Sequence, residues 1–206
     1  MRLPQPPLLV VTDRHQASAP LERVLAACFA AGCRWASVRE KDLPPAGQVA
    51  LAKRLGALAA DHDVRLALHG DPRLARDAGL DAVHLASGSD AAAARALLGK
   101  DAFIGTSVHS VREAEGLDAA LVDYAIAGPA YVSASKPGYG PALGPAGIAG
   151  ICRASPVPII AIGGIATGAV AEIIAAGAAG VAVMGGIMRA REPAREVDAL
   201  LAALAA

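Results

Sequence analysis

The sequence predicts a protein of the α/β class, a single-domain (β/α)8 TIM barrel that spans residues 1–206. Short apolar runs rich in β-branched residues alternate with Ala- and Leu-rich stretches along the whole chain, which is typical of parallel strands joined by helices. About eight strand–helix units follow one another, and this number favours a closed barrel over an open sheet. A Gly pair follows each of the last two predicted strands, as in barrels that bind phosphate at that end.

The predicted strands are short, and a helix follows each of them. The strands are expected at residues 8–11, 35–38, 64–68, 82–85, 103–106, 122–127, 158–162 and 181–184. The helices are expected at residues 20–31, 45–61, 72–78, 90–98, 111–116, 145–153, 167–176 and 192–205. Because Ala and Leu are strong helix formers, the Ala-rich stretches indicate helices and not disordered, low-complexity sequence.

The composition indicates one hydrophobic core and excludes two kinds of partner. Hydrophobic residues make up 54% of the chain and aromatic residues only 3%, so Ala, Val, Leu and Ile must fill the core. The formal net charge is zero, which gives no electrostatic reason to expect nucleic acid or an anionic membrane as a partner. Gly, Pro or charged residues interrupt every apolar run before it reaches the length of a membrane span.

The first residues and the cysteines indicate the cellular compartment. The chain starts without the basic region and apolar core of a secretory signal. Cys28, Cys33 and Cys152 form an odd set without metal-ligand spacing, so reduced thiols and a cytoplasmic location are expected. The sequence leaves open whether the chain forms a homo-oligomer.

Three cations are candidate contacts for an anionic ligand. Arg39 and Lys41 alternate in the extended segment after the second predicted strand, so both side chains can point the same way. Arg can grip a carboxylate or phosphate through two parallel hydrogen bonds. The alternative for this pair is a solvated basic strand end. Lys136 lies in the longest irregular segment, residues 128–143, which could form a lid over the ligand or serve only as a connection.

Histidines follow three of the predicted strands, at His69, His84 and His109. Their spacing matches neither HxH nor HExxH, and no metal site is predicted. His109 precedes Ser110 and Glu113, which form a capping-box pattern. An imidazole at such a place can move a proton in both directions near neutral pH. His109 is therefore either an acid–base group or a side chain of the capping loop.

The two Gly pairs, Gly163 with Gly164 and Gly185 with Gly186, are candidates for binding a phosphate group. Without a Cβ, their backbone N–H groups can face a ligand directly, and a following helix N-terminus adds positive potential. The alternative is that the glycines only allow tight strand-to-helix turns. Two copies after the last two strands favour the phosphate site.

Seven motifs along the chain occur in the order found in one known family. They are VTDR (11–14), VREKD (38–42), VHLASGS (83–89), GTSVHSVREA (105–114), DYAIAGP (123–129), PIIAIGGI (158–165) and GVAVMGGI (180–187). On these motifs the chain resembles the thiamine phosphate synthase superfamily over nearly its whole length. Within that superfamily it is more similar to the TenI-like branch, the thiazole tautomerases, than to the synthases.

A few positions carry this choice of branch. Synthases have Asn-Asp after the third strand, where this chain has His69 and Gly70, and an acidic residue after the fourth, where it has Ser89. In synthases the two acids hold the magnesium ion that accompanies a pyrimidine diphosphate, and Gly and Ser do not supply the charged oxygen ligands of a hard cation. Residues 107–110 are similar to the SVHS motif of the tautomerases.

The resemblance implies a thiazole tautomerase-like isomerase of thiamine biosynthesis, which moves a proton within a small-molecule thiazole phosphate. It implies His109 as the catalytic acid–base group, with no cofactor and no metal ion. The implied substrate contacts are Arg39, Lys41, His69, Ser107, Lys136, Gly163, Gly164, Gly185 and Gly186. Two alternatives stay open: a thiamine phosphate synthase, which joins thiazole phosphate to a pyrimidine diphosphate, and a non-catalytic regulatory protein that binds thiazole phosphate.

Overall fold

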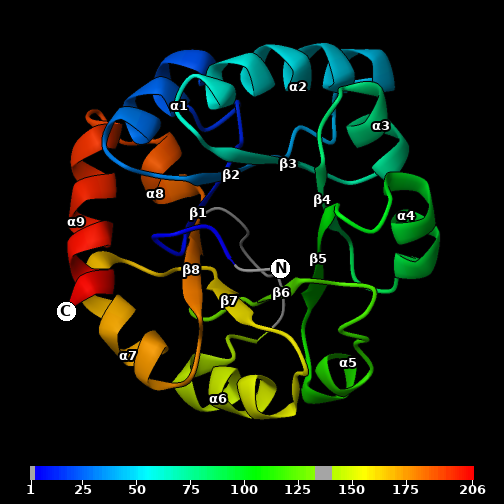
Figure 1. Cartoon of the computed structure of the whole chain (residues 1–206). Coiled ribbons are helices and arrows are strands. Elements are labelled where there is room, and N and C mark those ends of the chain that lie inside the picture. Colours follow the sequence, from blue (N-terminus) through cyan, green and yellow to red (C-terminus); the bar gives the residue numbers. More distant parts are fainter. Residues whose placement is uncertain (1–2, 133–140) are drawn as a thin grey trace.

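The computed structural model describes residues 3–132 and 141–206, and within them the chain forms a closed barrel of parallel strands surrounded by helices (Figure 1). The strands are β1 (Leu8–Val11), β2 (Trp35–Val38), β3 (Arg65–His69), β4 (Ala82–Leu85), β5 (Phe103–Val108), β6 (Tyr124–Ala127), β7 (Ile159–Ile162) and β8 (Gly180–Val183). They follow one another around the ring in sequence order, and β8 pairs with β1 to close it. The predicted (β/α)8 barrel is confirmed.

The helices lie outside the ring of strands and cover it on all sides in Figure 1. They are α1 (Leu21–Ala30), α2 (Pro45–Ala60), α3 (Pro72–Asp77), α4 (Ala91–Leu98), α5 (Val111–Glu115), α6 (Gly144–Ala154), the 3-10 turn η1 (Thr167–Ala169), α7 (Val170–Ala175), α8 (Gly185–Met188) and α9 (Pro193–Ala205). The short helix α8 is absent from the prediction, because its residues read only as a Gly turn after the last strand.

Strand ends differ from the prediction where a neighbouring strand decides them. β5 continues to Val108, two residues beyond its predicted end, because residues 107 and 108 pair with Ile126 and Ala127 of β6. β6 starts at Tyr124, not at residue 122, and the Asp123 carboxylate before it accepts a hydrogen bond from the Ile104 amide at 2.8 Å. The pattern of a single strand does not contain this pairing information.

Aromatic side chains fill the amino-terminal half of the barrel interior. Trp35, Phe103 and Tyr124 are the first residues of their strands, and all three are buried. The ring centroids of Trp35 and Tyr124 lie 4.7 Å apart. Gly105 pairs with Tyr124 in the sheet, and a Cβ at position 105 would lie 2.1 Å from the Tyr124 ring. The missing side chain at position 105 makes room for the Tyr124 ring.

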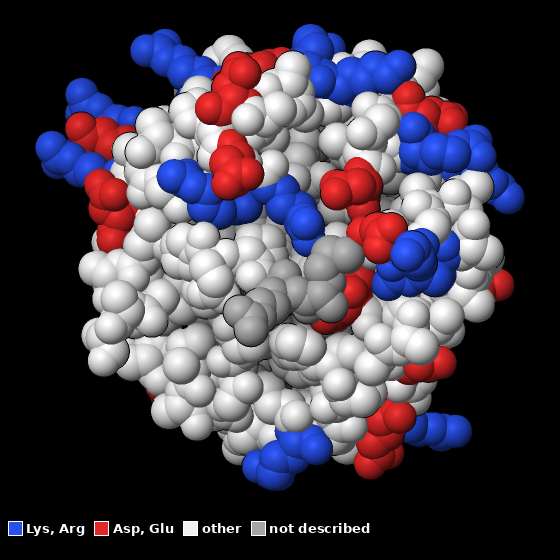
Figure 2. Space-filling view, viewed as in Figure 1, with Lys and Arg blue, Asp and Glu red and all other residues white. Residues whose placement is uncertain are grey.

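The described residues include no helix long and apolar enough to cross a membrane. On the face of the molecule shown in Figure 2, acidic side chains lie next to basic ones, and much of the remaining surface is uncharged. The described residues of this face therefore form no extended basic patch of the kind that binds a polyanion.

Candidate active site

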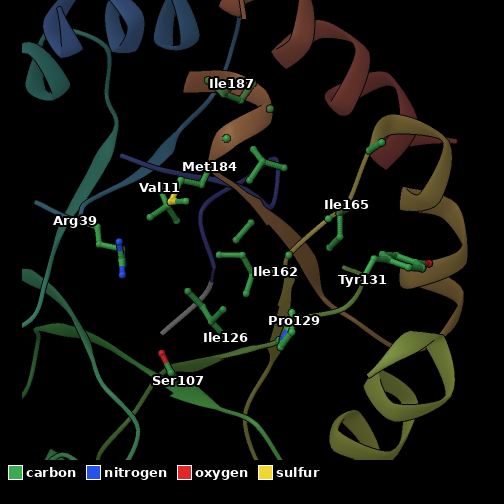
Figure 3. Close-up of a pocket in the computed structure, with 18 of the residues that line it drawn as sticks. Val11, Arg39, Ser107, Ile126, Pro129, Tyr131, Ile162, Ile165, Met184 and Ile187 are labelled. Atoms are coloured by element: carbon green, nitrogen blue, oxygen red, sulfur yellow. The ribbon is translucent and has the colours of Figure 1, made fainter. Parts of the chain in front are cut away.

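A cavity of about 770 Å³ opens at the carboxyl ends of the strands (Figure 3). Its volume is ordinary for a small-molecule site, and barrel enzymes have their active sites at this end. The cavity brings together the predicted site residues of β2, β3, β5, β7 and β8 and the loops that follow these strands: Arg39, Lys41, His69, Ser107, His109, Gly163, Gly164, Gly185 and Gly186. The predicted contact Lys136 and half of the predicted lid, residues 133–140, lie outside the described residues.

The first Gly pair forms a tight turn against the segment that follows β6. Gly163 and Gly164 have φ values of +102° and +65°, which favour glycine over residues with a side chain. A Cβ on Gly164 would lie 2.6 Å from the Val132 carbonyl oxygen. The Tyr131 amide donates a hydrogen bond to the Gly163 carbonyl at 2.9 Å. Sterics and backbone conformation therefore account for part of the glycine requirement in this turn.

The second Gly pair starts helix α8 without an intervening loop. Gly185 is its first residue and is buried, whereas Gly186 is exposed in the cavity wall. Among the described residues, a Cβ on Gly186 would meet nothing within 4 Å, and φ at this position lies outside the left-handed region. Neither sterics nor conformation requires glycine here, and without a side chain the backbone of this residue stays open to a ligand in the cavity.

The segment after β2 directs its charges in two opposite directions. Arg39 and Lys41 line the cavity, and Figure 3 shows the Arg39 side chain pointing into it. The buried Glu40 between them points away and accepts a 2.7 Å hydrogen bond from the Thr12 hydroxyl. The Arg14 amide and guanidinium also donate to the Glu40 carboxylate, at 3.1–3.2 Å. The alternation predicted for Arg39 and Lys41 is observed.

The next acid in the segment, Asp42, is also paired outside the cavity. Arg14 donates two hydrogen bonds to its carboxylate, and His15 Nε2 lies 2.9 Å from it. The neighbouring guanidinium holds the pKa of the Asp42 carboxyl well below its usual range. The structure therefore uses both acids of this segment to hold Arg14, and neither faces Arg39 or Lys41.

His84 is fully buried and connects two hydroxyl groups inside the barrel. Its Nδ1 lies 3.2 Å from the Tyr124 hydroxyl, and its Nε2 lies 3.0 Å from the Ser107 hydroxyl. Burial, and then the charge of Lys41, lower the pKa of His84 to about 3, so the ring is neutral near pH 7. The His69 ring lies 4.6 Å from it at the cavity wall. Through His84 of β4, the Ser107 hydroxyl of β5 is therefore linked to the Tyr124 hydroxyl of β6.

His109 is held by two backbone contacts. Its Nδ1 lies 2.8 Å from the Gly128 carbonyl oxygen and must donate to it, so in the neutral ring Nε2 is the basic nitrogen. The Ser110 hydroxyl accepts from the Glu113 amide and caps α5, as the capping box predicts. The Glu113 carboxylate accepts from the His109 amide, one residue earlier than in a standard capping box. The loop therefore holds the imidazole in one tautomer at the cavity.

Apolar side chains separate the cationic part of the cavity from its glycine turns. Val11, Ile126, Ile162 and Met184 lie between Arg39 on one side and Tyr131 and Ile165 on the other (Figure 3). A ligand that fits this arrangement has a flat apolar body and anionic groups at its ends.

Sequence reasoning missed several residues that shape this site. Tyr124 orients His84, and Thr12 and Arg14 orient Glu40, although none of the three lines the cavity. The available signal was a glycine in the middle of a predicted strand, at position 105, which often marks a close approach of another group.

The family model described as thiamine monophosphate synthase matches residues 8–187 of this chain. The chain belongs to this family. The matched residues include every strand of the barrel and both Gly turns.

Curated relatives carry related names. The thiamine biosynthesis bifunctional protein ThiM/ThiE of Symbiobacterium thermophilum is 40% identical over 179 residues, which cover 86% of this chain but only 37% of that protein. The thiamine-phosphate synthase of Roseiflexus sp. is 35% identical over 202 residues, covering 95% of this chain and 84% of the relative. The solved thiamine phosphate pyrophosphorylase from Pyrococcus furiosus has the same fold, with a TM-score of 0.85 at 24% identity over 96% of this chain and 95% of that one.

The predicted thiazole tautomerase activity, an isomerase function, is wrong. Relatives matched along nearly the whole chain, such as that of Roseiflexus sp., are named thiamine-phosphate synthase, and such enzymes are transferases. The family match does not distinguish a TenI-like branch. The tautomerase interpretation relied on turn residues such as Gly70 and Ser89. Loop residues at the ends of barrel strands change readily while the scaffold persists, so a few of them do not decide between branches.

Proposed function

We propose that this protein is a thiamine-phosphate synthase, a transferase that joins a thiazole phosphate to a pyrimidine carried as a diphosphate ester. The observation that supports this function best is the two-ended cavity, with glycine turns on one side and the cations Arg39 and Lys41 on the other. Two phosphorylated substrates need two anion sites, and their rings need the apolar walls between those sites.

The thiazole phosphate would place its phosphate against the turns of β7 and β8. Gly164 and Gly186 present backbone N–H groups without a side chain in the way. The thiazole ring would pack on Ile126, Ile162 and Met184, which line the middle of the cavity. Lys136 stays a predicted contact of the same substrate.

The pyrimidine diphosphate would place its diphosphate beside Arg39 and Lys41, with Ser107 as a hydroxyl donor. In the reaction the thiazole nitrogen forms a bond to the pyrimidine methylene carbon. The carbon–oxygen bond breaks, and its electron pair leaves with the diphosphate. Fixed cations near the departing oxygen stabilise the charge that develops there. His109, when protonated, would donate from Nε2 to a diphosphate oxygen.

The test is a coupling assay with both substrates. Thiamine phosphate and diphosphate should appear in equal amounts, and Arg39→Gln should lower turnover by about 100-fold, since one fixed charge at a transition state typically contributes this much. Lys53→Gln, which removes an exposed cation of α2, is the matched control. Binding of thiazole phosphate without any turnover would overturn this proposal and favour the non-catalytic binding protein.

A further inference from the structure

We propose that this protein binds the diphosphate group directly on its own cations, Arg39 and Lys41, with no divalent metal ion between protein and ligand. The inference deepens the proposed function and rests on it for the identity of the second substrate. It departs from the synthase pattern, in which two acids hold magnesium at this end of the cavity.

The charged side chains that follow β2 point in different directions. Arg39 and Lys41 line the cavity, while Glu40 and Asp42 both point to Arg14. Among the described residues, the side chains of Arg39 and Lys41 have no hydrogen bond or ion pair with an acid. Two like charges on one wall repel each other, and an anion bound between them offsets this repulsion.

Three further acids near the mouth stabilise turns and helix ends. The Asp71 carboxylate caps α3 by accepting from the Arg73 amide, and the Asp90 carboxylate caps α4 by accepting from the Ala93 amide. The Asp13 carboxylate accepts from the His15 amide. Each of these carboxylates stabilises a local turn, and none lines the cavity.

The atoms that face the cavity are poor ligands for a magnesium ion. Hard cations such as Mg²⁺ prefer carboxylate and carbonyl oxygens. On the β2–β5 side, the polar groups that line the cavity are Arg, Lys, His and Ser side chains. Within residues 3–132 and 141–206, no group of three or more His, Cys, Asp or Glu side chains could hold a metal ion. The acid found among the described lining residues, Glu196, belongs to α9 outside the ring of strands. These residues do not fit a magnesium site.

The surroundings of Lys41 disfavour its positive charge. Partial burial, and then the charge of Arg39, lower the pKa of the Lys41 ammonium. A bound anion would offset the effect of Arg39 and favour the charged form of Lys41. The two side chains therefore gain an opposite charge when the diphosphate binds, and no metal is needed for that neutralisation.

The test is isothermal titration calorimetry with inorganic diphosphate as the probe. Diphosphate should bind in excess EDTA, and excess Mg²⁺ should not tighten the binding, because the magnesium complex of diphosphate carries less negative charge. In EDTA, Arg39→Gln and Lys41→Gln should each weaken the affinity by about 10-fold, the usual effect of one charge-assisted hydrogen bond. Lys53→Gln should leave the affinity unchanged.

Binding that disappears in EDTA and returns with Mg²⁺ would overturn the inference. So would an absence of binding under both conditions, or metal-free binding that neither Arg39→Gln nor Lys41→Gln weakens. The coupling assay separates this inference from the proposed function. Metal-free diphosphate binding without turnover would contradict only the proposed synthase function. Turnover that requires Mg²⁺ would contradict only metal-free diphosphate binding.

Discussion

The two ends of the cavity are built from different parts of the polypeptide. At the β7–β8 end the site consists of backbone, and each turn comes from a few consecutive residues around Gly164 and Gly186. At the β2–β5 end the site consists of side chains whose direction depends on other loops. Arg39 faces the cavity because Glu40 is held on the opposite side by Thr12 and Arg14.

This difference has a consequence for how each end tolerates change. A backbone site depends on the absence of side chains, so adding one at the unobstructed Gly186 should block it without disturbing the fold. A side-chain site depends on a network, so a substitution outside the cavity can disturb it. Substitutions at the two ends of the cavity should therefore change different properties of the protein.

Gly186→Asp should weaken thiazole phosphate binding by about 100-fold, because a carboxylate placed beside a phosphate site repels the ligand by a few kcal/mol. The thermal unfolding midpoint should stay unchanged, since a Cβ at this position meets no described atom within 4 Å. Gly168→Asp is the control, because its Cβ is equally unobstructed and Gly168 does not line the cavity. Unchanged affinity in Gly186→Asp would show that the phosphate binds elsewhere.

Glu40→Gln should lower the free energy of unfolding by about 2 kcal/mol, because the new amide group would face the Arg14 donors in a buried place. Diphosphate affinity should fall as well, since the segment that directs Arg39 loses its anchor. Urea denaturation and calorimetry measure the two effects. Glu22→Gln, which breaks the exposed pair with Arg54, should cost less than about 0.5 kcal/mol. Full stability in Glu40→Gln would contradict the anchoring role.

His84 should make the folded state less stable as the pH falls. The pKa of His84 is about 3 in the folded protein, against an ordinary histidine value of 6.5, so below pH 6.5 the unfolded chain binds a proton that the folded chain does not. The stabilisation is complete above pH 6.5 and is lost as the pH falls from there toward 3. Between pH 7.5 and 5.5 this group should account for about 1.4 kcal/mol of lost stability.

His84→Gln removes this contribution, and the variant should show a smaller loss of stability over the same pH range. The measurement is urea denaturation at several pH values, with His62→Gln as the matched control. Equal pH dependence in the wild-type protein and His84→Gln would mean that His84 is not buried in its neutral form.

Asp42→Asn should have the smallest effect. Because Arg14, and then His15, hold the pKa of the Asp42 carboxyl below its usual range, its stabilising contribution is present above about pH 4 and is lost at lower pH. The variant should therefore lose less stability than the wild type between pH 6 and 3, and the difference should shrink at high salt because the pair is exposed. Parallel melting curves at all pH values would rule out this contribution.

Much of the fold was predictable from local pattern. The apolar runs at residues 8–11, 35–38 and 82–85 match β1, β2 and β4, because buried parallel strands are continuous apolar segments. Helix caps were readable where a side chain bonds to its own turn, as at Ser110. The end of β5 was not predictable, because pairing with β6 determines it.

The site was predictable to a different degree at its two ends. The Gly turns and the alternation of Arg39 and Lys41 depend on neighbours in the sequence. The contact of His84 with Ser107 joins residues 23 positions apart, and no local period reports it. The sequence also did not predict that Asp90 caps a helix, because an acid after a strand can equally bind a metal ion.

Local sequence pattern was enough to establish the number and order of the strands, the family and the positions of the two Gly turns. These properties follow from apolar periodicity, glycine placement and motif order, which act over short distances along the chain. Tertiary structure alone decided which side chains face one another across the barrel. Closing the ring turned Glu40 and Asp42 toward Arg14 and left Arg39 and Lys41 in the cavity, because hydrogen bonds between distant loops, and not local preference, set those directions.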